Sequence, residues 1–338
     1  MKTESRICIV GAGAIGGVLA GVLTREGHPV QLLVRQDGLA RKITEKGIRV
    51  EGACGNFSIT VPAVASTGDL EGTFDYVLVA TKADALEEAA SAMLPFLNEY
   101  SRVVSLQNGI CEGILAGVVG SDRTIGCVVG FGGTMHEPGR VEMTSGGELI
   151  IGNWNRKPDR QLEELARILS NVVPVRISET IYEELYSKLI INACITTLGA
   201  ISGQYLGEML SDRKNRILFI GIIREAIAVA SAIGIRVPAG ASGKLDYYKF
   251  LGPGLFSGIK RHLFIRVIGM KYRKLKSSSL QSLERGRKTE VENYNGYIAS
   301  RGKQLGVPTP VNEQLTRMVR ELEQGTRKIA PANLREIL

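Results

Sequence analysis

A glycine-rich turn near the start of the chain, GAGAIG, constrains the fold more than any other stretch of the sequence. It places Gly11, Gly13 and Gly16 in G-x-G-x-x-G spacing. The β-rich run RICIV (6–10) precedes the turn, apolar residues at helical intervals follow it, and PVQLLV (29–34) has the composition of a second buried strand. Strand, glycine turn, helix and strand in this order predict a Rossmann-type dinucleotide-binding unit.

Each glycine of the turn has an expected role in such a unit. Gly11 permits the tight turn, Gly13 lets the backbone approach a pyrophosphate, and Gly16 lets the helix pack on the strand. The helix N-terminus then faces the phosphates, and Gly27 is a candidate C-cap. The predicted cofactor-binding residues of this turn are Gly11, Ala12, Gly13, Ala14, Ile15 and Gly16.

The residue after the second strand indicates which cofactor is bound. Enzymes that use NAD usually carry an acid there for the ribose 2′-hydroxyl, whereas this chain has Arg35, and Asp37 follows two residues later. The charge and planar donor fork of a guanidinium suit a 2′-phosphate, so we favour NADP(H). An ordinary loop arginine is the alternative.

Two polar residues follow buried strands further along the chain. Lys82 comes after the strand expected at Asp75–Ala80, and Asn108 comes after the strand expected at Arg102–Leu106. Ligands of open α/β sheets bind beyond the carboxyl ends of strands, so both residues are candidates for binding. Each could also be a turn residue, since Asn-Gly is common in turns.

The rest of this half is expected to extend the sheet. GIRVEG and FSITVP resemble a β-hairpin, and CVVGFGGTM, RVEMTS and ELIIGN resemble further strands. A helix at Asp159–Ser170 and a strand at Val173–Ser178 would complete the sheet. We therefore assign residues 1–178 to an α/β Rossmann-type domain.

Helical periodicity replaces strand patterns after Ser178. We expect residues 179–338 to form an all-α domain that supplies substrate-binding and catalytic groups. The helices predicted in it are Glu179–Ile201, Arg216–Ile233, Ser277–Gly302 and Val311–Gln324.

The first of these helices contains an unusual polar pair. Lys188 and Asn192 lie four residues apart in the apolar run YSKLIINACITTLGAI, so they share one helix face. The alternative is that Lys188, near the start of the helix, only extends its ammonium to water and has no role in catalysis. Glu290 would share a face with Asn293 and Tyr294 in the third helix, or it belongs to an ordinary charged surface.

Composition narrows the classes of protein that need to be considered. Apolar residues make up 44% and charged residues 22%, and nothing in the chain is expected to span a membrane. The N-terminus has no signal-peptide pattern, and the five cysteines lack metal or disulfide spacing, so we expect a cytoplasmic protein without a metal site. The net charge of +8 suits nucleic acid, or equally a phosphorylated cofactor and a carboxylate substrate. Its excess over 244–276 is either a solvated helix face or a binding patch.

Together these motifs resemble the ketopantoate reductases (2-dehydropantoate 2-reductases) over nearly the whole chain. The shared features are the glycine turn, Lys82, Gln107-Asn108-Gly109, Lys188-Leu189-x-x-Asn192, and Ser278 and Gln281 leading to Gly286-Arg287-x-Thr289-Glu290.

The resemblance implies roles for individual residues. Lys188 would donate the proton to the substrate ketone, and Asn192 and Ser278 would contact the substrate. Asn108 and Glu290 would contact the cofactor or the reacting centre, so we count Glu290 as catalytic and Asn108 as a contact of both ligands. No metal is required.

Three departures from the family pattern concern the substrate. Thr196-Thr197 stands where the family often has Asn-Pro, and we keep Thr196 as a substrate contact. Tyr186 replaces the usual tryptophan, and a probable insertion at about 251–276 leaves Leu275 where an asparagine is expected. Two of these positions hold the substrate's distal hydroxyl in the family, so the identity of the 2-oxo acid is open.

The resemblance therefore predicts NADPH-dependent reduction of ketopantoate to pantoate, in pantothenate and coenzyme A biosynthesis. The alternatives are a reductase of another branched 2-oxo acid and, in a different class, an NADP-sensing or nucleic-acid-binding protein. We expect a small-molecule 2-oxo acid as partner and neither nucleic acid nor membrane. A homodimer is a possible assembly.

Overall fold

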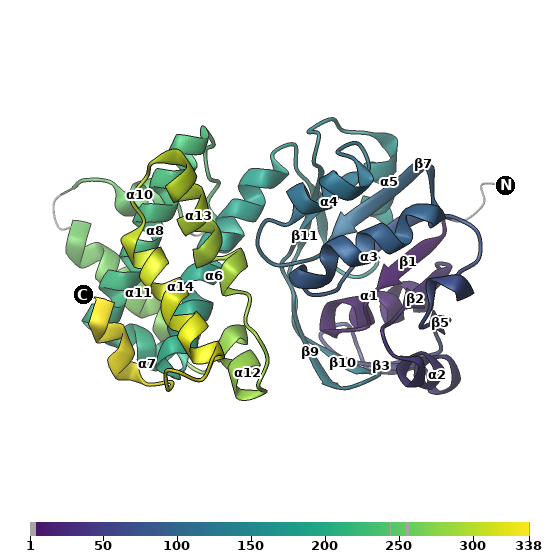
Figure 1. The fold of residues 1–338 in the computed structure, drawn as a ribbon, viewed down its shortest axis with the longest axis horizontal. Helices are drawn as coiled ribbons and strands as arrows, with labels where there is room; N and C mark the ends of the chain where they lie inside the picture. Colours follow the sequence, from purple (N-terminus) through teal and green to yellow (C-terminus); the bar gives the residue numbers. More distant parts are fainter. Residues whose placement is uncertain (1–4, 244, 255–256, 338) are drawn as a thin grey trace. The chain divides into compact units, whose positions relative to one another are not determined.

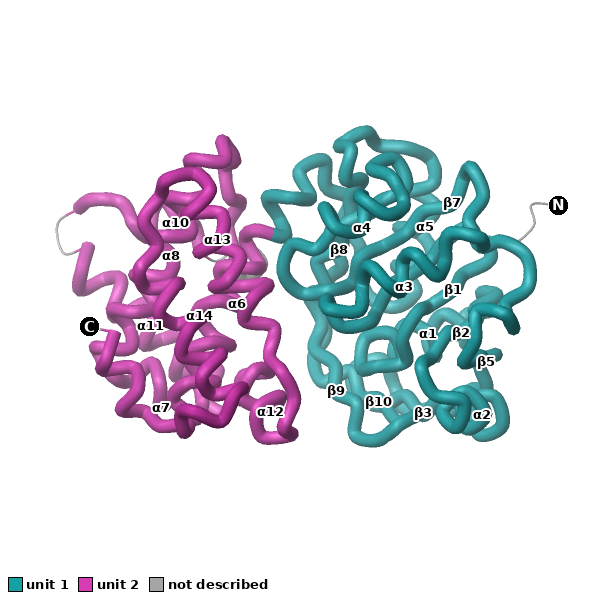
Figure 2. The backbone as a smooth tube through the Cα atoms, in the orientation of Figure 1, with its two compact units in different colours: residues 1–185 teal, residues 186–338 magenta. Residues whose placement is uncertain are grey.

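The computed structural model describes residues 5–243, 245–254 and 257–337. The chain divides into two compact units, Met1–Leu185 and Tyr186–Leu338 (Figure 1, Figure 2). The division falls inside one long helix, whereas the boundary expected from the sequence lies after Ser178, before this helix begins. The first unit is α/β and the second is helical, so the predicted fold class is confirmed.

The main sheet of the first unit confirms the expected Rossmann arrangement. Its strands are β1 (Ile7–Val10), β2 (Val30–Leu33), β5 (Ala63–Val64), β6 (Phe74–Val79), β7 (Leu97–Ser105), β8 (Thr124–Val129), β11 (Leu149–Asn153) and β12 (Val175–Ile177). The spatial order is β12-β11-β8-β7-β6-β1-β2-β5. The six strands β5-β2-β1-β6-β7-β8, taken in their order across the sheet, are all parallel to their neighbours. They follow the 3-2-1-4-5-6 order of dinucleotide-binding folds.

The strand order reverses between β1 and β6, which pair in parallel with Val10 opposite Val79. The loops that follow these two strands therefore leave the sheet side by side at its carboxyl edge. This is the switch point at which open α/β sheets bind ligands. Strand β7 begins earlier than predicted because Leu97 pairs with Phe74 across an irregularity in the register.

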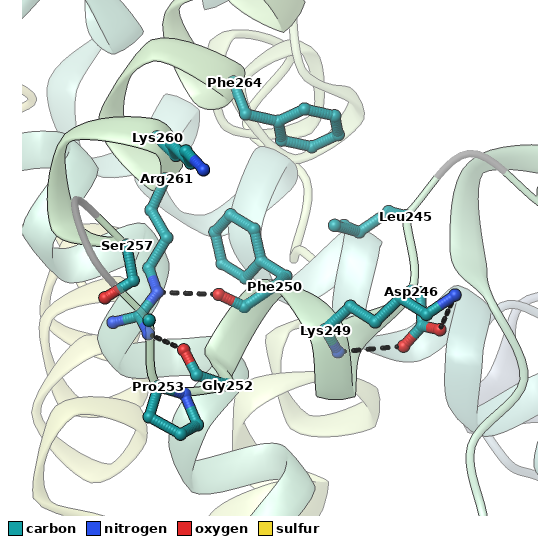
Figure 3. Close-up of a pocket in the computed structure, with 11 residues that line it drawn as sticks. Leu245, Asp246, Lys249, Phe250, Gly252, Pro253, Ser257, Lys260, Arg261 and Phe264 are labelled. Atoms are coloured by element: carbon teal, nitrogen blue, oxygen red, sulfur yellow. Dashed lines mark hydrogen bonds and ion pairs between the residues drawn. The ribbon is translucent and has the colours of Figure 1, made fainter.

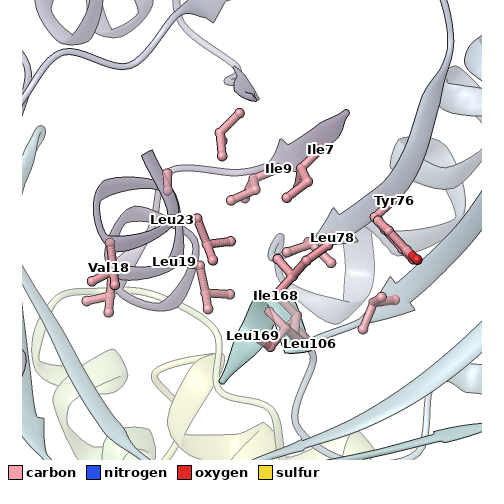
Figure 4. Close-up of a cluster of buried hydrophobic side chains, with 14 of the residues drawn as sticks. Ile7, Ile9, Val18, Leu19, Leu23, Tyr76, Leu78, Leu106, Ile168 and Leu169 are labelled. Atoms are coloured by element: carbon pink, nitrogen blue, oxygen red, sulfur yellow. The ribbon is translucent and has the colours of Figure 1, made fainter. Parts of the chain in front are cut away.

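The inner strands are buried on both faces, which explains their nearly continuous apolar sequences. Ile7 and Ile9 point into one core, shared with α1 (Ala14–Arg25) and α5 (Arg160–Leu169) and drawn in Figure 4. Cys8 and Val10 point into the other core, which is covered by α3 (Leu86–Met93) and α4 (Glu112–Val119). This alternation follows from the two-residue period of a strand.

A second, smaller sheet covers the outer side of α1. It contains β3 (Ile48–Gly52), β4 (Phe57–Ile59), β9 (Gly132–Glu137) and β10 (Arg140–Ser145) in the order β4-β3-β10-β9. The predicted hairpin is thus confirmed, but CVVGFGGTM is divided between β8 and β9, which belong to different sheets. The α1 helix can lie against this sheet because Gly17 and Gly21 face it. A Cβ on either would come within 2.8 Å of Val141 or 2.5 Å of Val50.

The remaining short helices of the first unit connect the strands. They are α2 (Asp37–Lys46), η1 (Thr67–Asp69), η2 (Ala83–Ala85) and η3 (Leu94–Phe96). The helix expected at Asp159–Ser170 is α5, and its N-cap Asp159 accepts a hydrogen bond from the backbone N–H of Leu162 at 2.8 Å.

The second unit consists of helices packed on one another. They are α6 (Ile181–Ser202), which begins in the first unit, α7 (Leu206–Ser211), α8 (Arg213–Ile233), α9 (Gly240–Gly243), α10 (Tyr247–Leu251), α11 (Ser257–Lys271), α12 (Ser278–Glu284), η4 (Val291–Asn293), α13 (Asn295–Leu305), α14 (Pro310–Glu323) and η5 (Pro331–Ile337). The predicted helices that became α6, α8 and α14 are confirmed.

The expectation that nothing in the chain could span a membrane was wrong as far as length and composition are concerned. Helix α6 has 22 residues, and an 18-residue stretch of it has a mean hydropathy of 1.3, which is enough for a span by these two criteria. However, 78% of that stretch is buried inside the protein. That degree of burial is typical of a core helix, in which apolar residues on all sides are covered by neighbouring elements.

The single helix predicted at 277–302 was also wrong. Helix α12 ends at Glu284, and α13 begins only at Asn295. Gly286 has a φ of +64°, which favours glycine and ends α12. The expected shared helix face of Glu290, Asn293 and Tyr294 therefore does not exist, because Glu290 lies in the connection between the two helices.

Candidate active site

The glycine turn has the geometry that a bound pyrophosphate needs. Gly11 has a φ of +105°, and a Cβ there would lie 3.1 Å from the carbonyl oxygen of Ala80. At Gly16 a Cβ would lie 2.0 Å from the Gly11 oxygen, so the turn and the helix require glycine at both positions. At Gly13, by contrast, a Cβ would meet no atom within 4 Å. No side chain caps the start of α1. These features fit a dinucleotide phosphate at the helix N-terminus.

The loops at the carboxyl edge are fastened by Gln107, a residue that the sequence analysis did not assign to the site. Its side chain is buried and donates to the carbonyl oxygens of Val79 at 3.0 Å and Thr81 at 3.1 Å. Its Oε1 accepts a hydrogen bond from Ser105 at 2.8 Å. Gln107 thus joins the end of β6 to the end of β7. The signal was present in Gln107-Asn108-Gly109, but only the fold shows what the amide contacts.

This fastening determines where the two candidate polar residues leave the sheet. Lys82 is exposed and precedes η2, and Asn108 is half-buried next to Gly109, which has a φ of +92°. The backbone oxygen of Asn108 lies 3.8 Å from the Sγ of Cys111, the N-cap of α4. Both residues therefore lie at the carboxyl edge of the sheet, where ligands of such folds bind.

Arg35 lies at the same edge, beyond β2. Its side chain is exposed, and the preceding residue, Val34, is buried. Gly11 donates its backbone N–H to the oxygen of Leu33 at 2.8 Å, which holds the glycine turn against the end of β2. The nearest acid, Asp37, begins α2 and forms an ion pair with Arg41. The exposed guanidinium is thus the charged group directly after β2, which is the position that reads the adenosine ribose in this fold.

In the second unit, the candidate catalytic residues occupy one stripe of α6. After Leu185 every residue of α6 is buried except Lys188, Ile191, Asn192 and Ile195, which are half-buried. These positions recur at three and four residues and therefore form one helix face. Lys188 is the only charged residue in this part of α6.

Thr196 and Tyr186, which differ from the family pattern, both donate their hydroxyl protons to backbone oxygens. Thr196 is buried and donates to the backbone oxygen of Asn192, one turn earlier, at 2.7 Å. The hydroxyl proton of Thr196 is therefore engaged within the helix, and its oxygen can accept a bond from another group. Tyr186 is fully buried and donates to the oxygen of Ala226 on α8 at 2.8 Å. The departure at Tyr186 thus concerns packing between α6 and α8.

Glu290 is held in the connection between α12 and α13 by residues on both sides of it. The hydroxyl of Tyr294 donates to its carboxylate at 2.8 Å. The preceding residue, Thr289, donates both its backbone N–H and its hydroxyl to Glu323 at the end of α14, each at 2.7 Å. Glu290 and Tyr294 are therefore in contact, as the sequence suggested, but through a turn rather than a helix face.

Ser278 is exposed at the first position of α12. The buried N-cap Ser277 accepts a hydrogen bond from Leu280 at 3.1 Å. A Cβ on Gly199 would lie 2.7 Å from the Ser277 hydroxyl, so the start of α12 packs closely on α6. Leu275 is 43% exposed and offers no side-chain hydrogen bond where the family pattern expects an amide.

A buried chain of polar side chains holds four helices of the second unit together. Thr197 on α6 donates to Asn295 on α13 at 2.5 Å, and Asn295 donates to Asn312 on α14 at 2.9 Å. Asn312 donates to Glu225 on α8 at 2.6 Å. The same carboxylate accepts the backbone N–H of Val311 at 2.9 Å, which caps the start of α14. The helix that carries Lys188 is thus linked to three neighbours by a chain of buried and partly buried hydrogen bonds.

Among the residues that the structure describes, no group of three or more His, Cys, Asp or Glu side chains could hold a metal ion. Four cysteines, Cys8, Cys111, Cys127 and Cys194, are buried, and none of them forms a disulfide with another described residue. Burial raises the pKa of Cys8 to about 12.

Comparison with known proteins agrees with the motifs. Residues 7–156 match the family described as ketopantoate reductase PanE/ApbA, and residues 180–323 match the ketopantoate reductase PanE/ApbA C-terminal family. The chain is 30% identical over 322 residues to the 2-dehydropantoate 2-reductase of Aquifex aeolicus, covering 94% of this chain and 97% of the relative. It is 27% identical over 341 residues to that of Mesorhizobium japonicum, covering 94% and 97%.

Solved structures show the same similarity in three dimensions. A PanE/ApbA family ketopantoate reductase from Ralstonia eutropha JMP134 has a TM-score of 0.81 and 30% identity, covering 96% of this chain and all of the other. D-mandelate dehydrogenase with NADH and anilino(oxo)acetate shares the fold, with a TM-score of 0.80 at 22% identity, covering 95% and 98%. The chain therefore belongs to the ketopantoate reductase family and is an oxidoreductase whose cofactor is NADP(H).

Proposed function

We propose that the protein reduces 2-dehydropantoate (ketopantoate) to pantoate with NADPH, a step of pantothenate and coenzyme A biosynthesis in the cytoplasm. The observation that carries this proposal is the half-buried stripe of Lys188 and Asn192 on an otherwise buried helix. An ammonium and a carboxamide on such a stripe suit a substrate with a carbonyl and a carboxylate. Membership of the ketopantoate reductase family supports the same reaction.

The proposed reaction adds a hydride and a proton across the C2 carbonyl of the substrate. Bound NADPH would supply the hydride to C2, while the carbonyl π electrons would move to the oxygen. Lys188 donates a proton from its ammonium to that oxygen and becomes a neutral amine, which solvent protonates again. While charge develops on the oxygen, the ammonium also stabilises it, so Lys188 acts as general acid and as electrostatic stabiliser.

The other proposed site residues bind and orient the ligands. Asn192 and Ser278 contact the 2-oxo acid, and Thr196 can accept a bond from its distal hydroxyl because its own proton is engaged by Asn192. Glu290, which is oriented by its hydrogen bond from Tyr294, contacts the reacting centre and the cofactor. Asn108 contacts both ligands.

On the cofactor side, we propose that Arg35 and Lys82 bind the dinucleotide together with the glycine turn. Arg35 would pair with the 2′-phosphate, which makes NADPH the preferred form of the cofactor. The exposed guanidinium directly after β2 supports this, since the nearest acid, Asp37, is already paired with Arg41.

Steady-state oxidation of NADPH across a panel of 2-oxo acids tests the proposed substrate. For ketopantoate, kcat/KM should exceed that for 2-oxoisovalerate, which lacks the hydroxymethyl group. A site built to bond a hydroxyl rejects an analogue without one by roughly 10⁴-fold. Similar values for the two acids would instead support a reductase of another branched 2-oxo acid.

That alternative rests on a specific observation. Leu275 offers no polar group where the family pattern has an amide, and Thr196 keeps only an acceptor. A larger kcat/KM for an acid with an apolar side chain would assign the alternative function. No activity toward any 2-oxo acid in the panel would contradict both.

A further inference from the structure

A surface pocket in the second unit includes no residue of the α6 stripe among its described lining residues, and three of those lining residues are arginines. It has a volume of about 490 Å³ and lies where the starts of α8 and α11 meet. No aspartate or glutamate belongs to the described residues that line it, which are Arg213, Arg216, Gly258, Ile259, His262, Leu263 and Arg266.

Arg216 is the buried base of this pocket. Its side chain donates from Nη1 to the backbone oxygens of Leu210 at 2.7 Å and Ser211 at 2.6 Å. The residue is only 9% exposed, yet its buried Nε has no hydrogen-bond partner among the described residues. An unsatisfied buried N–H is unfavourable, so a side chain that lines the pocket and carries one favours an acceptor bound there.

His262 lines the same pocket and carries a second unsatisfied polar atom. Its buried Nδ1 also has no hydrogen-bond partner in the described part of the chain. Burial lowers the pKa of His262, and the nearby charges of Arg216 and Arg213 lower it further. For Arg216 too, burial lowers the pKa, as do Arg266 and Arg213, whereas Asp212 raises it. The cations therefore repel one another, and an anion between them would relieve that repulsion.

Two exposed arginines complete the rim. The side chains of Arg213 and Arg266 make no hydrogen bond or ion pair with another described residue. Arg213 begins α8, and Gly258 and Ile259 belong to the first turn of α11, so the partial positive charges of two helix N-termini reinforce the side chains. A Cβ on Gly258 would meet no atom within 4 Å, which leaves the approach to this turn open.

The position of α11 is well defined by contacts with its neighbours. Figure 3 shows Arg261 donating to backbone oxygens at the end of α10, at 2.6 Å to Phe250 and 2.6 Å to Gly252. Gly269 packs against α7, where a Cβ would lie 2.9 Å from that of Leu210. In the pocket shown in Figure 3, Arg261 donates to backbone oxygens and Lys249 pairs with Asp246, so those cations have partners in the protein.

We propose that the pocket formed by Arg213, Arg216, His262 and Arg266 binds the phosphoryl group of a small phosphorylated molecule. Guanidinium forks match phosphate oxygens, and several cations around one pocket favour a dianion over a single carboxylate. Ile259 and Leu263, which are 67% and 59% exposed, provide an apolar wall for the rest of that molecule. This site is separate from the phosphate-binding turn at α1 and does not depend on the proposed substrate.

Calorimetric titration with inorganic pyrophosphate tests the proposal. The enzyme is first loaded with one equivalent of NADPH, so that the turn at Gly13 is occupied without an excess of nucleotide that could compete for this pocket. We expect saturable binding that weakens about 10-fold or more in Arg266→Gln and in Arg213→Gln, the usual effect of losing one charge-assisted hydrogen bond. Both side chains are exposed, so these variants should fold normally.

Lys260→Gln is the matched control, because it removes one positive charge from the same helix without touching this pocket. It should change the pyrophosphate affinity less than about twofold, since exposed charges outside the site are screened by salt. An equal loss in Lys260→Gln and Arg266→Gln, or no saturable binding by the NADPH-loaded enzyme, would overturn the site.

Two further measurements separate the sources of the phosphoryl group. Proton NMR should show a shift of the His262 ring signal on addition of pyrophosphate, assigned with His262→Gln among the three histidines of the chain. A DNA duplex should compete weakly. Binding to DNA that strengthens with duplex length and is lost in Arg266→Gln would replace the small molecule with a nucleic-acid surface and overturn the proposal.

Discussion

The hydroxyl of Thr197 on α6 donates to the side-chain oxygen of Asn295 on α13 over 2.5 Å, and both side chains are buried. This contact begins the polar chain that continues through Asn312 to Glu225. A proline, which the family often has at this position, has no hydroxyl and could not make this bond. The polar chain is thus specific to the residues found here and holds the helix that carries Lys188.

Replacing Thr197 by valine should destabilise the protein by about 1–3 kcal/mol, because the buried oxygen of Asn295 would lose its hydrogen bond while the volume stays similar. Urea unfolding followed by circular dichroism measures the change in the free energy of unfolding. Thr197→Ser keeps the hydroxyl donor, so its free energy of unfolding should fall clearly less than that of Thr197→Val. A valine variant as stable as the serine variant would mean that the bond contributes nothing.

Alanine at two glycines of the turn should separate folding from cofactor binding. Gly13→Ala should change stability by less than about 1 kcal/mol, because φ is −73° and no atom lies near the new Cβ. Its KM for NADPH should rise roughly 10-fold or more, since the methyl group would occupy the space of the pyrophosphate.

Gly16→Ala should instead lower thermal stability, since its Cβ would lie 2.0 Å from the Gly11 oxygen. Differential scanning fluorimetry without and with NADPH distinguishes the two variants. If Gly13→Ala binds NADPH normally, the pyrophosphate does not lie over this turn.

Arg35→Ala should raise KM for NADPH by about 10- to 100-fold and leave KM for NADH nearly unchanged. The reason is that a charge-assisted bond to the 2′-phosphate is worth about 1.5–3 kcal/mol, and NADH lacks that phosphate. NADH measured with the same variant is the internal control. Equal effects on both cofactors would show that Arg35 does not read the phosphate.

Lys188→Ala should lower kcat by about 10²–10⁴-fold, the usual effect of removing a positioned general acid. The affinity for NADPH, measured by fluorescence titration, should change little. A lysine that only extends to water would leave kcat nearly intact. Lys274→Ala, an exposed lysine in the same unit, is the control and should keep full activity.

The dependence of kcat/KM on pH gives a second test of Lys188. The free enzyme needs the ammonium protonated, so kcat/KM should fall as pH rises through the pKa of this lysine. The alkaline limb should disappear in Lys188→Ala. Lys188→Arg should not restore activity, because a guanidinium with a pKa above about 12 is a poor proton donor near neutrality. An unchanged limb in the alanine variant would assign it to another group.

Much of the first unit could be predicted because its signals are local. The strands around Ile9 and Leu32 are apolar runs bounded by turns. Gly11 has a positive φ, and a Cβ on Gly16 would meet the Gly11 oxygen five residues earlier. The same local reasoning failed between Ser277 and Gly302. That stretch has helical composition, but Gly286 and the contact of Thr289 with Glu323, 34 residues later, break it into separate pieces.

For the candidate site, residue types and spacing were enough to single out Lys188 and Asn192, because an i, i+4 pair shares a helix face whatever surrounds it. They could not show that the rest of α6 is buried, which distinguishes a site from a solvated face. Nor could they reveal the role of Gln107, whose amide contacts Val79 and Thr81 on a neighbouring strand, or the pocket at Arg216.

The amino-acid sequence alone thus determined the α/β and helical halves, the glycine turn and the candidate stripe of α6, since each follows from patterns within a few turns of chain. Only the tertiary structure decided which polar groups meet. Thr197 and Asn295 are 98 residues apart, and Arg216 and His262 face one pocket from different helices. Such contacts depend on how whole helices pack, because packing brings distant side chains within hydrogen-bond range and removes the water that would otherwise satisfy them.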